Sequence, residues 1–246
     1  MTNAVVIGQS HTACMANAIS THPDKAWDIS VTRLRSGDKL NDPEALSIDD
    51  AMGLVSALEF GVPIFISIVG TYHNILGLIR FGEDFDFLMD GQSTISDESC
   101  LVPNKVLTSA FDENLKTEKD IQKLKAVSRG PVYLLACPPP KQDSEFMLQK
   151  LTARRNKPYR GRDVATHGIN RPELRRKLWL LECQRLELWA QGLEIGYLPP
   201  PIEAFDQDGF LAKQFYADDA THANAEYGAL VLSLIASTIE SRERPR

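Results

Sequence analysis

The chain has 246 residues, 43% of them hydrophobic, and a formal net charge of −6 at pH 7. This size and apolar content suffice for one sizeable core, so we expect a single domain over residues 1–246. The acidic balance argues against a protein that binds nucleic acid by neutralising phosphates, and no apolar run is long enough to span a bilayer. We therefore expect no nucleic-acid partner, no membrane anchor and no signal peptide.

Five short runs rich in apolar and β-branched residues predict buried strands. They cover residues 4–8, 28–34, 62–70, 131–137 and 194–199. Longer periodic segments between them predict helices, one of which begins at Ser47 as N-cap with Asp50 three residues later, and another at Asn170 as N-cap. Alternating strands and helices are typical of a parallel sheet covered on both faces, so we predict an α/β protein with a three-layer α/β/α sandwich and a five-stranded parallel sheet.

Two charged segments interrupt this alternation. Residues 71–130 form a long excursion with an acidic aromatic stretch and a charged helix candidate at 112–127, and such charge runs are usually solvated faces. Residues 141–177 hold 11 Lys/Arg and 4 Asp/Glu, a net charge of +7, and we expect a basic loop at 141–170. One interpretation is a lid that attracts an anionic substrate. The other, which we favour, is a solvated loop or one packed against the acidic excursion.

Ser10 lies in "IGQSHT", between the first predicted strand and a predicted helix. A hydroxyl there stands in the positive field of a helix N-terminus, beside backbone N–H groups that can hold an oxyanion. Serine is also a favoured N-cap residue, and this stretch by itself favours a cap over a nucleophile.

A second motif places Asp219 three residues before His222, just ahead of the last predicted helix. At this spacing the carboxylate can reach Nδ1 of the imidazole, which leaves Nε2 free to accept a proton from a hydroxyl. A single Asp-x-x-His motif is weak evidence when taken alone.

Together the two motifs resemble those of the SGNH (GDSL-like) hydrolase superfamily. "IGQSH" is similar to the serine block of that family, and "DATHANAEYG" to its terminal block, where an Asn and a Gly commonly follow the histidine, as Asn224 and Gly228 do here. The resemblance implies a flavodoxin-like fold over almost the whole chain. It also implies that Ser10 is the nucleophile, His222 the general base and then acid, and Asp219 the orienting carboxylate.

The resemblance further implies an oxyanion hole made by the backbone N–H of Ser10, a glycine N–H after the second strand and an asparagine side chain after the third. Gly37 stands in the place of the glycine. Tyr72 stands where the asparagine is expected, and Asn74, two residues later, is either the third donor or a helix cap. Gln9 replaces the aspartate that usually precedes the serine, which indicates a divergent branch.

Other polar side chains near the predicted site are candidates for substrate contact: His11, Tyr72 and His73. The histidines lack the His-x-His or His-x-x-x-His spacing of metal ligands, so we predict no metal and no cofactor. The four cysteines are scattered without a CxxC pair, which is typical of reduced thiols in a cytoplasmic protein.

The sequence thus predicts a serine esterase that hydrolyses an acyl ester, such as an acetyl ester, of a carbohydrate or small metabolite through an acyl-enzyme on Ser10. Two alternatives stay open. One is an O-acyltransferase with the same triad, and the other is a non-catalytic SGNH-fold binding protein, which the departure at Tyr72 favours. A nucleotide-binding flavodoxin-like protein is disfavoured, because Gly8 is the only glycine where a phosphate loop needs several.

Overall fold

The structure is a computed structural model, and its described part comprises residues 3–25, 27–35, 45–89, 95, 96, 99–116, 118–153, 159 and 161–243. Its centre is a parallel sheet of five strands in the order β2-β1-β3-β6-β7. The strands are β1 (Ala4–Gly8), β2 (Ile29–Arg33), β3 (Ile64–Ser67), β6 (Val132–Leu135) and β7 (Gly196–Leu198). Each lies inside one of the five predicted runs, so the predicted fold class is confirmed.

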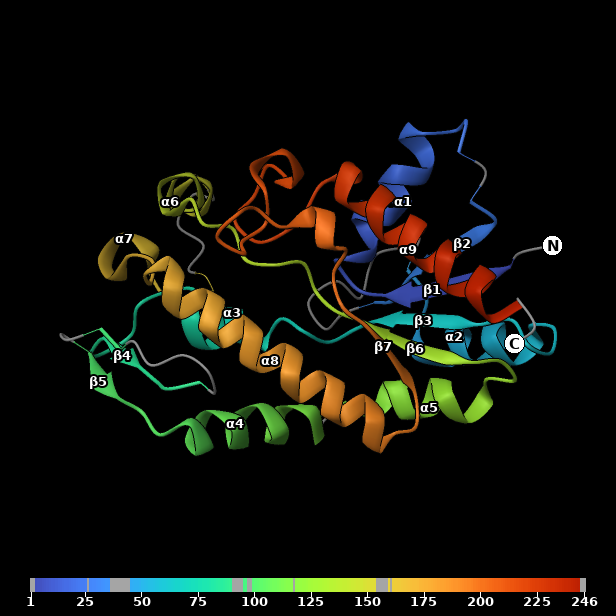
Figure 1. The fold of residues 1–246 in the computed structure, drawn as a ribbon, viewed down its shortest axis with the longest axis horizontal. Helices are drawn as coiled ribbons and strands as arrows, with labels where there is room; N and C mark the ends of the chain where they lie inside the picture. Colours follow the sequence, from blue (N-terminus) through green and yellow to red (C-terminus); the bar gives the residue numbers. More distant parts are fainter. Residues whose placement is uncertain are drawn as a thin grey trace.

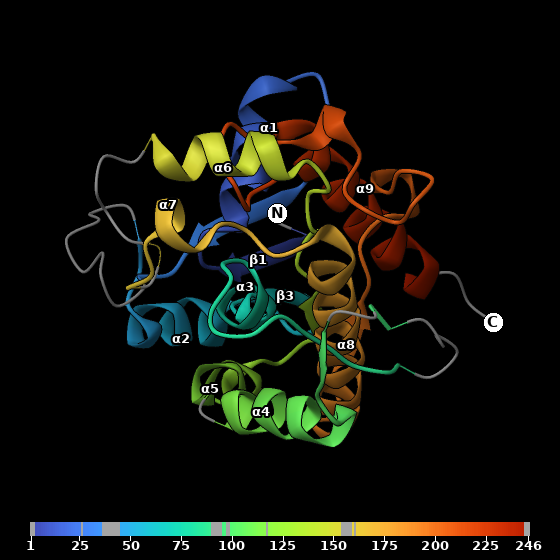
Figure 2. The same ribbon diagram turned by 90° about the vertical axis from the view of Figure 1, so that its left-hand side faces the viewer.

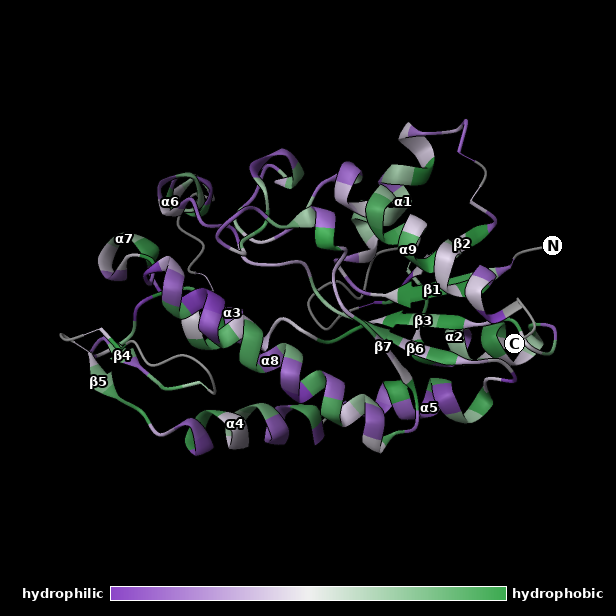
Figure 3. Cartoon of the chain, in the orientation of Figure 1, coloured by the Kyte–Doolittle hydropathy of each residue, from purple (hydrophilic) through white to green (hydrophobic). Residues whose placement is uncertain are grey.

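Alternate residues of the sheet face two apolar clusters. Ala4 and Val6 of β1 pack with α1 (Thr12–Thr21) and α9 (Ala225–Glu243), whereas Val5 and Ile7 pack with α2 (Ile48–Ala57), α5 (Lys119–Val127) and the end of α8 (Pro172–Gly192). Figures 1 and 2 show α1 and α9 on one side of the sheet and α2 and α5 on the other. The inner strands β1 and β3 are buried along their length because both faces of the sheet are covered, and both are mainly hydrophobic (Figure 3).

The long excursion forms a layer beside the first half of α8 (Figure 1). It contains α3 (Tyr72–Gly77), β4 (Phe85–Asp86), β5 (Cys100–Leu101), α4 (Asn104–Lys116) and α5. The single charged helix expected at 112–127 is therefore wrong, since α4 ends and α5 begins within it. One side of this layer is apolar, because Phe87, Leu107 and Phe111 pack against Leu174 and Leu178 of α8.

Two residues at the end of the basic segment pair with the acidic excursion. Arg171 and Lys177 form ion pairs with the buried Asp86 of the excursion, at 2.7 and 2.9 Å. The segment expected as a loop, however, contains α6 (Ser144–Thr152) and α7 (Val164–His167). Asp143 starts α6 by accepting a hydrogen bond from the Phe146 backbone N–H at 3.0 Å, so a local cap forms a helix that the charge pattern did not reveal.

The two predicted N-caps differ in outcome. Ser47 and Asp50 form a reciprocal capping box at the start of α2, as predicted. Asn170 does not cap α8, because its buried side chain donates to the carbonyl groups of Gly77 and Ile79 and the helix begins at Pro172.

Candidate active site

Ser10 lies in the turn between β1 and α1, at the carboxyl edge of the sheet. The turn is closed by backbone hydrogen bonds from Thr12 to Gln9 at 3.1 Å and from Ala13 to Ser10 at 3.2 Å. Gly8 permits the turn, since a Cβ on it would lie 2.3 Å from the carbonyl oxygen of Ser67 on the neighbouring strand. No side chain caps α1, and the exposed Ser10 hydroxyl makes no hydrogen bond to any residue in the described part. Ser10 was a candidate for a helix cap and for a nucleophile, and its side chain does not cap α1 in the structure.

Asp219 and His222 are in contact as their spacing predicted. Oδ2 of Asp219 lies 2.7 Å from Nδ1 of His222, and Oδ1 accepts the backbone N–H groups of Thr221 and His222 at 2.8 and 2.7 Å. Burial by itself raises the pKa of Asp219, but the hydrogen bonds from the His222 ring and backbone outweigh it and hold this pKa well below its ordinary value. The carboxylate is therefore ionised, and it favours the His222 tautomer whose Nε2 is unprotonated.

The two other residues of the terminal block bring this loop to the sheet. Asn224 caps α9 by accepting the backbone N–H groups of Glu226 and Tyr227, and its amide donates to the carbonyl oxygen of Gln214 at 2.7 Å. Gly228 lets α9 lie directly on α1, because a Cβ there would be 2.1 Å from the carbonyl oxygen of Cys14. Close packing of α9 on α1 places the loop that precedes α9 beside the turn that precedes α1.

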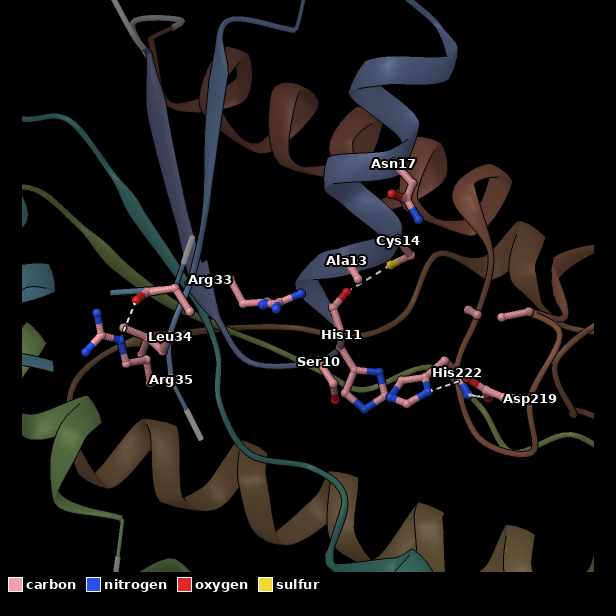
Figure 4. Close-up of a pocket in the computed structure, with 13 residues that line it drawn as sticks. Ser10, His11, Ala13, Cys14, Asn17, Arg33, Leu34, Arg35, Asp219 and His222 are labelled. Carbon is pink, nitrogen blue, oxygen red and sulfur yellow. Dashed lines mark hydrogen bonds and ion pairs between the residues drawn. The ribbon is translucent and has the colours of Figure 1, made fainter. Parts of the chain in front are cut away.

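One cavity of about 290 Å³ holds all three predicted triad residues. Figure 4 shows Ser10 and His222 on its wall, with Asp219 behind His222. The hydrogen bonds of the described residues do not include one between Ser10 Oγ and His222. Catalytic hydrogen bonds of this kind are often formed only when substrate binds.

His11 lies against His222 in the same cavity. The two ring centroids are 5.3 Å apart, and Figure 4 shows the His11 ring on the Ser10 side of His222. The pKa of His11 is lowered to about 3, mainly by desolvation and also by the nearby His222 and His73, against the opposing effect of Asp219. His11 is thus a neutral imidazole next to the dyad, in a position to touch a bound substrate.

The remaining predicted residues lie elsewhere or outside the described part. Gly37 lies outside the described residues. Asn74 lies in the first turns of α3 and borders two small cavities, neither of which contains Ser10. The ring of Tyr72 packs on Phe111 with centroids 5.5 Å apart, inside the apolar layer of the excursion. The structure therefore does not bring Tyr72 or Asn74 into the cavity of the triad residues.

His73 is buried and belongs to a second histidine–carboxylate pair. Its Nδ1 lies 2.6 Å from Oε2 of Glu182, and both side chains are 3% exposed. Glu182 also accepts the backbone N–H groups of Tyr72 and His73, at 2.9 and 3.0 Å, which fixes the start of α3. The sequence did not indicate Glu182, because it lies 109 residues away on α8 and looks like an ordinary helix residue.

Two arginines of the cavity wall were also not predicted. Arg33 ends β2, Arg35 follows it, and both line the cavity with Ser10 and His222. In Figure 4 the Arg33 side chain extends toward the start of α1. The sequence did carry a signal for them. Arg33 lies near the end of the predicted strand at 28–34 and Arg35 follows it, and residues two apart at a strand end share a face.

Within the described ranges, no group of three or more His, Cys, Asp or Glu side chains is placed to hold a metal ion. The described helices also include none that is both long and apolar enough to cross a membrane.

No model of a known protein family matches the chain, and a search of curated proteins finds no match. Solved structures are similar to it. One is the periplasmic domain of a lipopolysaccharide acetyltransferase from Salmonella ser. Paratyphi A, with a TM-score of 0.50 and 14% identity over 98% of this chain and 84% of that one. The chain shares the α/β fold of that domain, with a parallel sheet of five strands at its centre.

Two further similar structures have lower scores. A GDSL-like lipase from Bacteroides thetaiotaomicron has a TM-score of 0.46 and 12% identity, over 97% of this chain and 88% of that one. A carbohydrate acetylesterase from Sinorhizobium meliloti has a TM-score of 0.43 and 11% identity, over 97% of this chain and 99% of that one. At these identities the likeness concerns the fold, and the activity has to be argued from the site.

Proposed function

We propose that this chain is a serine esterase that hydrolyses a short acyl ester through an acyl-enzyme on Ser10. The observation that carries the proposal is the Asp219–His222 hydrogen bond of 2.7 Å in a cavity that also holds the exposed Ser10 hydroxyl. A nucleophile, a base and an orienting acid on one cavity wall are the minimum set for acyl transfer.

The proposed reaction begins when Nε2 of His222 takes the proton of the Ser10 hydroxyl as Oγ attacks the ester carbonyl carbon. Asp219 keeps Nδ1 protonated and stabilises the imidazolium that forms. The carbonyl π electrons move onto oxygen, and we expect the backbone N–H of Ser10, in the turn before α1, to stabilise that charge, with Gly37 as the expected second donor. His222 then protonates the leaving alcohol, and a water molecule releases the acyl group by the same steps.

The cavity favours a small substrate that carries negative charge. Its volume of about 290 Å³ accommodates a short acyl group and part of an alcohol rather than a long lipid chain. Arg33 and Arg35 contribute two guanidinium groups to its wall, whereas the carboxylate of Asp219, which also lines it, is engaged by His222. Guanidinium groups bind carboxylates and phosphates through paired hydrogen bonds, so we expect an ester with such a group.

This preference is measured with two aryl esters, p-nitrophenyl propionate and p-nitrophenyl hemisuccinate, which differ by one terminal carboxylate. We expect a higher kcat/KM for the hemisuccinate than for the uncharged ester. The ratio of these two kcat/KM values is expected to fall by roughly tenfold in an Arg33→Gln variant, because the variant loses one charge-assisted contact. If the ratio of the two kcat/KM values is the same in the parent and in the variant, Arg33 does not contribute to substrate recognition.

The nucleophile is tested by labelling with a fluorophosphonate probe. The parent is expected to be labelled, and Ser10→Ala to lose the label and the turnover of aryl acetates. Ser20→Ala is the matched control, because Ser20 lies exposed on the same helix and its hydroxyl only donates to the carbonyl group of Asn17. Labelling that survives in Ser10→Ala contradicts the assignment, and an unlabelled parent supports the non-catalytic binding protein.

An O-acyltransferase is the second candidate, since the same acyl-enzyme can pass its group to a sugar hydroxyl instead of water. The similar Salmonella domain belongs to an acetyltransferase, which keeps this alternative open. Product analysis with and without an acceptor alcohol separates the two activities.

A further inference from the structure

A buried lysine lies beneath the loop that carries Asp219 and His222. Lys141 follows β6, is 1% exposed, and is the only lysine among the largest fully buried side chains of the described part. Its ammonium donates to the carbonyl oxygens of Ala217 and Asp219, at 2.8 and 2.5 Å. The same ammonium lies 5.0 Å from the ring centroid of Phe146 and 4.9 Å from that of Tyr216. No carboxylate side chain of the described part forms an ion pair with it.

These contacts occur at the base of the loop. The backbone N–H of Ala217 donates to the carbonyl oxygen of His222 at 3.1 Å, and a bridge joins Tyr216 to Ala223, so the residues between them form a closed loop. The two carbonyl groups that Lys141 holds belong to this loop, and one of them belongs to the residue whose carboxylate orients His222. A buried cation is costly to desolvate, so its retention at this place calls for a role beyond filling space.

We propose that Lys141 is a positioning residue, whose ammonium holds the 217–222 loop so that the Asp219 carboxylate meets Nδ1 of His222. The proposal rests on the esterase function proposed above, because the geometry that Lys141 maintains is that of the Asp219–His222 dyad. Lys141 does not touch the reacting atoms. It acts through the backbone of Ala217 and Asp219.

The charges around Lys141 make this role dependent on pH. The pKa of Lys141 is lowered to about 8: burial and Lys150 lower it, and the carboxylates of Asp219 and Asp218 partly oppose this effect. Tyr216 packs against the ammonium, and Arg175 and His73 line the same small cavity as Lys141. Above about pH 8 the amine loses its charge and one donor, which weakens its hold on the two carbonyl groups.

The test compares Lys141→Met, which keeps the volume and removes the charge, with Lys150→Met. Lys150 is the matched control, because it reaches the same loop through an ion pair with Asp218 and lies 5.4 Å from the Phe146 ring centroid, yet it holds no backbone carbonyl of the loop. We expect Lys141→Met to lower kcat and the rate of Ser10 labelling by roughly ten- to a hundredfold, the range for a misplaced catalytic group, with KM little changed. Lys150→Met is expected to stay close to the parent.

A second readout does not require activity. The tautomer of His222, observed by ¹⁵N NMR of the labelled protein at pH 7.5, is expected to be the Nδ1–H form in the parent and in Lys150→Met. In Lys141→Met a mixture with the Nε2–H form is expected. If Ser10 is never labelled but the tautomer changes in this way, the esterase function fails and the positioning role stands.

The proposal is overturned if Lys141→Met keeps both the parental labelling rate and the Nδ1–H tautomer. Should this variant not fold, the parent provides the same test, because the tautomer is expected to become mixed between pH 7.5 and 9.5 while the circular dichroism stays constant. A pure Nδ1–H form at a pH where NMR of the Lys141 side chain shows that its amine is neutral refutes the role.

Discussion

Replacing Asp219 by asparagine removes the contact that organises the proposed catalytic site. Its Oδ1 can still accept the backbone N–H groups of Thr221 and His222, so the loop keeps two of the three hydrogen bonds made by the carboxylate. The amide group that replaces Oδ2 is a donor, and it therefore favours the His222 tautomer whose Nδ1 is unprotonated. In that tautomer Nε2 carries the proton and cannot accept one from Ser10.

The size of the effect follows from these contacts. A wrong tautomer of this kind lowers kcat by roughly 10³- to 10⁴-fold, equivalent to about 4 to 5 kcal/mol of transition-state stabilisation. The fold loses one charge-assisted hydrogen bond of a side chain that is 29% exposed, which costs about 1 kcal/mol and lowers Tm by about 2 to 4 °C. Activity and stability are thus expected to change by very different amounts.

The assay is the turnover of an aryl ester beside thermal unfolding of the same preparations, with Asp218→Asn as the control. Asp218 precedes Asp219 in the chain, but its side chain is 87% exposed and pairs with Lys150 instead of His222. We expect Asp218→Asn to keep activity within a few-fold of the parent, since an exposed ion pair contributes little. The reasoning is refuted if Asp219→Asn keeps more than a tenth of the parental kcat, or if Asp218→Asn loses more activity than Asp219→Asn.

Two predictions concern pH and packing. His11 has a folded pKa of about 3 and an unfolded value near 6.5, so its contribution to stability is present above pH 6.5 and lost as pH falls toward 3. His11→Gln is expected to reduce the loss between pH 7 and 5 by about 2 kcal/mol in urea unfolding, and an unchanged loss would contradict the desolvation of a neutral ring. Gly228→Ala is expected to destabilise the fold by about 1 to 3 kcal/mol, because its Cβ meets the Cys14 backbone. Gly53→Ala, with open space around its Cβ in α2, is expected to be neutral or stabilising in thermal unfolding, and equal effects of the two would refute this account.

Local patterns in the sequence accounted for the five strands of the sheet, for the start of α2 and for the dyad, but not for α6 and α7. The five apolar runs became the five strands because a parallel sheet buried on both faces needs continuous apolar segments. The spacing of Asp219 and His222 suffices for their contact, since residues three apart in a turn can meet without help from the rest of the chain. The Ser47 capping box was visible for the same reason.

Contacts between distant segments were beyond such patterns. Asn170 has the composition of an N-cap, yet its side chain satisfies carbonyl groups more than ninety residues away, and this competing partner is invisible locally. Glu182 and Lys141 look like ordinary charged residues of a helix and a basic segment. Only the packing of α8 beside α3, and of the segment after β6 beneath the 217–222 loop, gives them buried partners.

The sequence by itself determined the five strands of the sheet, and it placed Ser10 and the Asp219–His222 motif at opposite ends of the chain. The tertiary structure decided that these ends meet, because β1 lies inside the sheet and Gly228 lets α9 pack on α1. It also decided which charges surround the cavity. Arg33 and Arg35 line it, whereas Arg171 and Lys177 of the basic segment pair with Asp86, since ion pairing and burial depend on neighbours that only the folded chain provides.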